Sequence, residues 1–166
     1  MSIYMEVSDW RVAGLGSAEA GAGPAAGSWF FFFESATADV RLGFSFVGGG
    51  IGVGGRGGAV DLPVGLGSVG LQFTALACDR PFSGLDLHRA GGRLTGAGIG
   101  KGVGGATAIL SAWSWSWRDR WLFRSQETYG ANLSLGGSAI STVGIWSMAR
   151  ADLRHYRSTV LDAQSA

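Results

Sequence analysis

The chain has 166 residues, of which 30 are glycine, 46% are hydrophobic and only 15% are charged, with a formal net charge of +1. This balance excludes intrinsic disorder, which pairs low hydrophobicity with high net charge, and the three prolines are too few for a collagen triple helix. The basic residues are scattered, so we expect no nucleic-acid partner. The length predicts one glycine-rich β-domain over residues 1–166.

The N-terminal residues do not resemble a secretory leader. Glu6 and Asp9 stand where a leader is apolar, and no basic segment precedes them. We therefore expect a protein that is cytoplasmic, exported by a leaderless route or already trimmed, including one that associates with a membrane. The single cysteine, Cys78, cannot form an internal disulfide and does not argue for an oxidising compartment.

The first third of the chain combines a small-residue stretch with aromatic and glycine patterns. Residues Gly14–Ser28, rich in Gly and Ala, predict a loose loop before the aromatic cluster Trp29–Phe33. From Gly48 to Gly58, glycine then recurs at alternate positions. Because successive side chains of a strand point to opposite faces, this alternation predicts a strand with one bare face. A weaker alternation over Val69–Ala75 predicts another strand.

The residues most able to carry catalysis lie between positions 78 and 88. They include one thiol and one imidazole, the minimum for a nucleophile and its base, in the set Cys78, Asp79, Asp86 and His88. The favoured interpretation is structural, with the cysteine ending an apolar strand and the acids belonging to turns. The chain has only two histidines, too few for a multi-histidine metal site. We expect no catalytic residue, metal or cofactor, and no enzyme activity.

The clearest pattern runs from Gly96 to Trp117. Every even position from 96 to 104 is glycine, and the odd positions later become bulky. This pattern predicts one long extended segment with a bare face and an aromatic face. An alternative is a packed helix using the four-residue spacing of Gly92, Gly96, Gly100 and Gly104. The strand is favoured because the spacing of two accounts for more glycines, each of which weakens a helix by about 1 kcal/mol.

The last part of the chain contains an uncharged strand pattern and then a helical one. Apolar and small residues alternate over Tyr129–Trp146, which predicts a further extended segment. From about residue 148 to 162, apolar residues recur every three or four positions beside a stripe of arginines. This change of period predicts a short amphipathic helix, for which docking on the sheet is favoured and contact with an anionic membrane is the alternative.

Together these elements predict an all-β fold, a glycine-rich antiparallel sheet with a short C-terminal amphipathic helix. A regular strand loses roughly 0.5–1 kcal/mol for each glycine it carries, so a bare face needs a structural reason. Such a face permits a sharp bend or the close approach of a large side chain. We therefore expect the sheet to be strongly curved or closed into a barrel.

The aromatic residues give the strongest indication of function. Three tryptophans at alternate positions border the charged turn at 118–120, and two more aromatic residues follow it; we expect membrane or ligand contact from Trp113, Trp115, Trp117, Trp121 and Phe123. The alternative for these rings is a packed aromatic core.

These features predict a non-enzymatic β-protein that contacts a membrane or lipid, including a leaderless pore-forming toxin or effector. One alternative is a structural protein that assembles with its own copies through glycine faces. Another is a binding module in which the tryptophans form a platform for a sugar or an apolar ligand.

Overall fold

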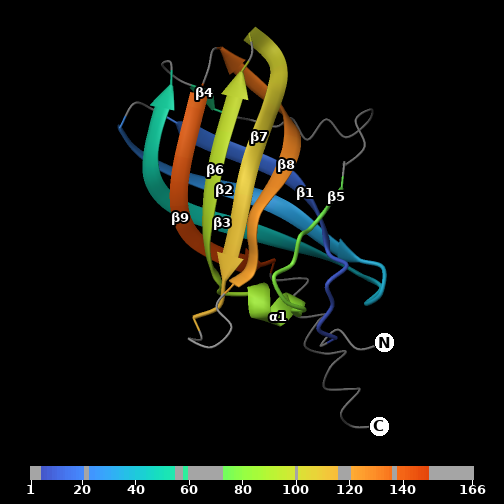
Figure 1. Cartoon of the computed structure of the whole chain (residues 1–166). Coiled ribbons are helices and arrows are strands. Elements are labelled where there is room, and N and C mark those ends of the chain that lie inside the picture. The colour runs from blue at the N-terminus through green and yellow to red at the C-terminus, as the bar shows by residue number, and fades with distance from the viewer. Residues whose placement is uncertain are drawn as a thin grey trace.

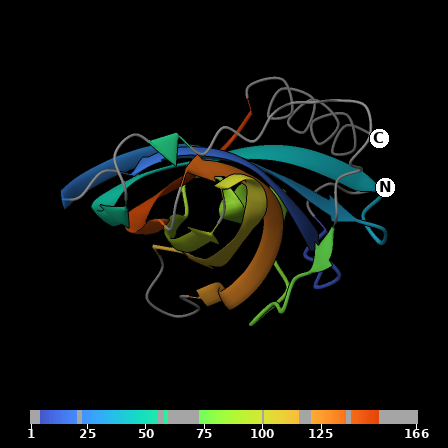
Figure 2. The ribbon, with the colours of Figure 1, turned by 90° about the horizontal axis from the view of Figure 1, so that it is seen from above.

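The computed structural model describes residues 5–20, 23–54, 58–59, 73–99, 101–115, 121–135 and 138–149. These form an almost entirely antiparallel, strongly curled sheet, a half-barrel, as the sequence predicts (Figure 1; Figure 2). The described strands are β1 (Arg11–Ala20), β2 (Gly23–Ser35), β3 (Val40–Gly54), β4 (Gly58–Ala59), β5 (Thr74–Ala75), β6 (Gly91–Ile99), β7 (Lys101–Trp113), β8 (Trp121–Leu135) and β9 (Ser138–Met148). The helix α1 (Gly84–Leu87) lies between β5 and β6.

The sheet is built from two meanders joined by the last strand. Its order is β4-β1-β2-β3-β9-β6-β7-β8, with β5 also paired to β1. Strands β1 to β3 are sequential neighbours, as are β6 to β8. Strand β9 pairs with β3 on one side, where Val47 lies opposite Ile145, and with β6 on the other, where Gly91 lies opposite Ile145. The two halves of the sheet are therefore connected through β9.

A short segment, residues 73–79, links β1, which is next to one end of this order, with β8 at the other end; we call it the strap. On one side it pairs with β1 through β5, and the Leu76 N–H donates a hydrogen bond to the Trp10 carbonyl at 2.8 Å. On the other side Cys78 forms a bridge with Phe123 of β8, and the Asp79 N–H donates to the Leu122 carbonyl at 2.9 Å. The strap thus holds β1 and β8 together at the end of the half-barrel near α1.

Aromatic rings fill the interior of the half-barrel. Strand alternation places Trp29, Phe31 and Phe33 of β2 inside, while Phe30 and Phe32 remain partly exposed. The central ring is Trp146, whose centroid lies 5.0–6.3 Å from four phenylalanine rings. The buried aromatic cluster around it consists of Phe31, Phe33, Phe44, Phe46, Phe123 and Trp146.

Two structural requirements explain why glycine occupies certain positions on the inner face of the sheet. At Gly92, an added Cβ would collide with the Trp146 ring and approach Phe46, so the glycine leaves room for the aromatic cluster. At Gly144 and Gly50, an added Cβ would instead collide with backbone of the neighbouring strand. The glycines therefore permit both ring packing and the tight curl of β3 against β9.

The prediction of a loose loop at Gly14–Ser28 is wrong for the described residues, because 14–20 lie in β1 and 23–28 lie in β2, two strands that pair with each other. Small residues of β1 lie opposite large rings of β2: Gly14 pairs with Phe31 and Gly16 with Trp29. A composition rich in Gly and Ala resembles a loop when it is read alone. Here it supplies the small partner of an aromatic strand, which only the pairing reveals.

The prediction of one long extended segment over Gly96–Trp117 is also wrong in its continuity. The chain reverses between β6 and β7, where Ile99 pairs with Gly105. The even-numbered residues of β6 and β7 still share one face of the sheet, since Gly96 lies opposite Ala108. The helical alternative is excluded for the described part of this range, because β6 and β7 are strands. Tyr129–Trp146 is likewise divided, between β8 and β9.

Several predicted segments lie wholly or partly outside the described residues. Of the predicted helix over 148–162, Met148 belongs to β9 and residues 150–162 are not described. Of the predicted strand Val69–Ala75, only residues 73–75 are described. Among the described residues, no helix has the length and apolar character needed to cross a membrane.

Candidate functional site

The described members of the predicted contact set lie in different surroundings. Strand β7 ends at Trp113, whose ring packs edge-on against that of Trp121 at 5.5 Å. Trp115 therefore lies beyond the strand, and Trp117 lies outside the described residues. Phe123 is fully buried in the aromatic cluster. Trp115 is exposed, whereas Trp113 and Trp121 are half-buried.

Trp115 is held in place although it is 67% exposed. Its indole Nε1 donates a hydrogen bond of 2.8 Å to the carbonyl of Arg89. Arg89 has a φ of 69°, in the left-handed region, and its N–H donates to the Trp146 carbonyl at 2.7 Å. The exposed ring is thus connected through Arg89 to the backbone of β9.

The outer surface of the sheet carries exposed aliphatic side chains on neighbouring strands. Strand β9 is central to them, because Val143 and Ile145 point outward beside Val47 and Gly49 of β3. The exposed fractions lie between 40% and 69%. We call this surface the aliphatic face; it consists of Val47, Ile51, Ile109, Val143 and Ile145.

The aliphatic face is not evident from the amino-acid sequence alone. Alternation assigned Val143 and Ile145 to one side of an extended segment, but alternation alone does not distinguish the inner side from the outer one. Two signals were available: the aliphatic residues between the glycines of β3, and the absence of charge along β9.

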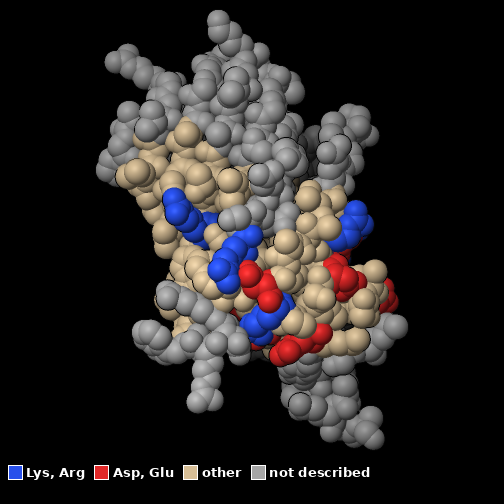
Figure 3. Space-filling view, in the orientation of Figure 1, with Lys and Arg blue, Asp and Glu red and all other residues tan. Residues whose placement is uncertain are grey.

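Charge is unevenly distributed around this surface. Arg93 of β6 is exposed and lies opposite Val143 in register. The ion pairs formed among the described side chains involve other arginines, namely Arg11, Arg41 and Arg124. Figure 3 views the side on which β9, β6 and β7 lie in front. The described charged residues there occupy the middle and lower half, with uncharged described surface above them.

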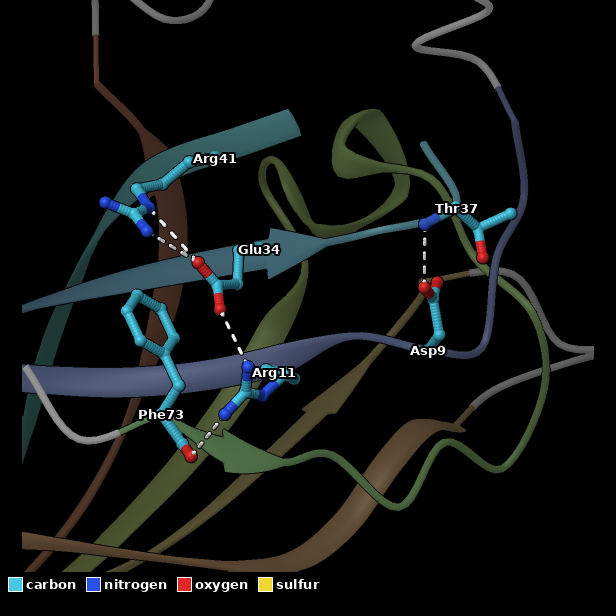
Figure 4. A network of polar contacts seen from close by, with 6 residues as sticks. All are labelled: Asp9, Arg11, Glu34, Thr37, Arg41 and Phe73. Carbon is cyan, nitrogen blue, oxygen red and sulfur yellow. Dashed lines mark hydrogen bonds and ion pairs between the residues drawn. The ribbon is translucent and has the colours of Figure 1, made fainter. Parts of the chain in front are cut away.

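A network of ion pairs and hydrogen bonds fastens the strap to the outer side of the sheet (Figure 4). Glu34 of β2 forms ion pairs with Arg11 at 3.3 Å and Arg41 at 2.8 Å. Both guanidinium groups lie over the ring of Phe73, at 5.8 and 5.1 Å from its centroid. Arg11 also donates to the Phe73 carbonyl at 3.3 Å. The single carboxylate balances only one of the two guanidinium groups, so the network keeps a net charge of +1 while it holds the start of the strap against β1–β3.

The Cys78–His88 group contributes to the fold. Burial raises the pKa of the Cys78 thiol to about 11, so the nucleophilic thiolate is scarce at neutral pH. Asp86 accepts hydrogen bonds from the backbone N–H and hydroxyl of Ser83, both at 2.8 Å, and thereby caps α1. His88 Nδ1 accepts from the Met148 N–H at 3.2 Å. Among the described residues, no group of three or more His, Cys, Asp and Glu side chains is arranged to hold a metal.

Asp9 gives a testable link between pH and stability. Burial alone raises the pKa of its carboxyl, but hydrogen bonds from the Ser35 hydroxyl at 2.6 Å and the Thr37 N–H at 2.9 Å outweigh burial and lower the pKa. A carboxyl whose pKa is lower in the folded state stabilises the fold above its unfolded pKa of about 3.9, and this stabilisation disappears as the pH falls through the folded pKa.

We expect Asp9→Asn to lower the free energy of unfolding by about 1 kcal/mol at pH 7 and by much less at pH 3. Urea denaturation of both proteins at the two pH values measures this difference. Glu6→Gln, at an exposed position, is the charge-matched control. An equal deficit for Asp9→Asn at pH 7 and pH 3 would contradict the assignment.

Searches of protein-family models, curated proteins and solved structures give no match to this chain, which leaves its own residues as the basis for a functional proposal.

Proposed function

We propose that this protein is a non-enzymatic lipid-binding protein that places the outer surface of β3, β9 and β6 against a membrane. The observation that carries the proposal is the aliphatic face, in which Val47 and Ile145 are exposed side by side on neighbouring strands. Transfer of apolar surface out of water is favourable by about 25 cal/mol per Å². The acyl region of a bilayer provides such an environment.

Two further features support contact with a membrane. The exposed indole of Trp115 combines an apolar ring with an N–H group, the type of side chain that is enriched at the level of lipid headgroups. Arg93 combines an apolar stem with a charge that stays in the headgroup layer. An aliphatic surface bordered by such residues suits a peripheral membrane protein.

The curvature of the sheet favours lipid over a second copy as the partner. The outer surface of a strongly curled sheet is convex (Figure 2), and two convex surfaces meet over a small area. A stable dimer generally buries about 800 Å² on each partner. A fluid bilayer adapts to a convex surface, so lipid covers the aliphatic face more completely.

The proposal concerns binding at the membrane surface. A pore through the interior of this half-barrel requires displacement of the aromatic cluster around Trp146. Surface binding requires no such rearrangement, because the aliphatic face is already exposed. Dye release from vesicles measures permeabilisation separately from binding.

The double substitution Val143→Ser and Ile145→Ser tests the proposal. We expect it to weaken binding to phospholipid vesicles by roughly 30-fold, because the two side chains together contribute about 2 kcal/mol when they enter the acyl region. Co-sedimentation with vesicles measures the binding, and a thermal melt checks that the fold is retained.

The control introduces serine at two exposed positions elsewhere, Met5 and Ala75, and should bind as the wild type does. Absence of wild-type binding to every vesicle tested, or equal binding by the Val143/Ile145 variant, would reject the proposal. Concentration-dependent dimerisation that the Val143/Ile145 variant abolishes, without lipid binding, would assign the aliphatic face to self-assembly instead.

A further inference from the structure

Three polar side chains lie together within the aliphatic face. Arg93 and Thr95 share the outer side of β6, and Ser141 lies opposite Thr95 on β9. Arg93 Nη2 donates to Ser141 Oγ at 3.2 Å, and Ser141 Oγ lies 3.4 Å from Thr95 Oγ1. A guanidinium and two hydroxyls are therefore gathered at one place on the outer surface.

Aliphatic side chains surround this group on three strands. Val143 is the register partner of Arg93, Ile51 of β3 is the partner of Ser141, and Ile109 of β7 is the partner of Thr95. All three aliphatic side chains are exposed. The polar group thus forms an island in the apolar surface.

Arg93 of the island forms no ion pair among the described side chains. Among the described acidic residues, Glu34 pairs with Arg11 and Arg41, and Asp79 pairs with Arg124. Asp86 caps α1, and Asp9 binds Ser35 and Thr37. The site therefore presents positive charge and hydroxyl groups to a ligand.

We propose that Arg93, Ser141 and Thr95 bind the phosphate of an anionic phospholipid headgroup, an inference that rests on the proposed membrane contact. The planar guanidinium matches two phosphate oxygens, and each hydroxyl supplies a further hydrogen bond. In a bilayer the phosphate lies directly above the acyl chains, which places those chains against Val143, Ile51 and Ile109. A free phosphate ion gains nothing from the aliphatic surroundings, which is why we assign the site to a lipid.

The experiment compares vesicles of phosphatidylcholine alone with vesicles that also contain phosphatidylglycerol. We expect the wild type to bind the anionic vesicles more tightly, and Arg93→Gln to lose about tenfold in affinity for them while changing little toward phosphatidylcholine. Arg93→Lys should lie between the two, because lysine keeps the charge but loses the planar fork.

Arg124→Gln is the matched control, since it removes the same charge from an arginine that is paired with Asp79. Equal losses for Arg93→Gln and Arg124→Gln would overturn the headgroup site. Release of the protein from vesicles by inorganic phosphate, but not by chloride at equal ionic strength, would overturn the assignment to lipid.

The two proposals fail separately. If Val143→Ser with Ile145→Ser removes binding while Arg93→Gln behaves like its control, the membrane contact stands and the headgroup site is rejected. If the serine substitutions have no effect, the membrane contact through the aliphatic face is rejected first.

Discussion

Trp146→Ala is expected to lower the free energy of unfolding by about 3–5 kcal/mol, which is a large part of the roughly 5–15 kcal/mol that stabilises an ordinary domain. The side chain is fully buried and contacts rings from β2, β3 and β8. Its Nε1 also donates to the Ser111 carbonyl of β7 at 3.2 Å. Alanine would leave a large cavity where these strands meet, and an unpaired carbonyl beside it.

Urea denaturation followed by circular dichroism measures this loss. Trp115→Ala is the matched control, because it removes the same side chain from an exposed position, and we expect it to cost less than about 1 kcal/mol. If the two substitutions had similar effects, Trp146 would not be the centre of the core.

The second large effect is expected from Gly144→Ala, at about 3 kcal/mol. A methyl group at this position would collide with the Val47 carbonyl oxygen and would lie 2.6 Å from the Gly48 Cα. Both are backbone atoms of β3, so no side-chain rotation relieves the contact. Strands β3 and β9 would have to separate where they hold the two meanders together.

Gly49→Ala provides the control for this experiment, since Gly49 lies at an exposed outer position of β3. We expect it to change the free energy of unfolding by no more than about 0.5 kcal/mol. Denaturation midpoints of both variants give the comparison. A tolerated alanine at position 144 would show that the curl of β3 against β9 does not depend on the missing side chain.

Much of the strand content was predictable from alternation, because the period of two is a local property of the chain. The glycine pattern around Gly48–Gly54 correctly predicted a strand with a bare face. The curvature was predictable because a bare face permits a sharp bend or the close approach of a large side chain. For Gly92 the answer is the ring of Trp146, from a distant part of the chain.

Strand partners and strand ends were not predictable in the same way. Gly14 and Gly16 lie in a strand because Phe31 and Trp29 lie opposite them, which composition does not reveal. Likewise, the register shifts between Leu110 and Trp113 and β7 ends at Trp113, so the strand alternation does not continue to Trp115.

The candidate site was predictable only in part. Trp115 was identified and is exposed, whereas Phe123 has the same aromatic character and lies in the core. The aliphatic face depends on Val47 and Ile145 lying side by side, which requires the pairing of β3 with β9. Such non-local pairing is set by the packing of the whole sheet.

The position of β9 between β3 and β6 also affects how the chain is made. The two meanders form from contiguous stretches, but each has an edge that β9 alone covers among the described strands. During synthesis the ribosome releases residues 138–148 after all the other described strands, so both edges remain unpaired until then. Open edges pair readily with other chains. The nascent protein is therefore most exposed to aggregation just before its last described strand emerges.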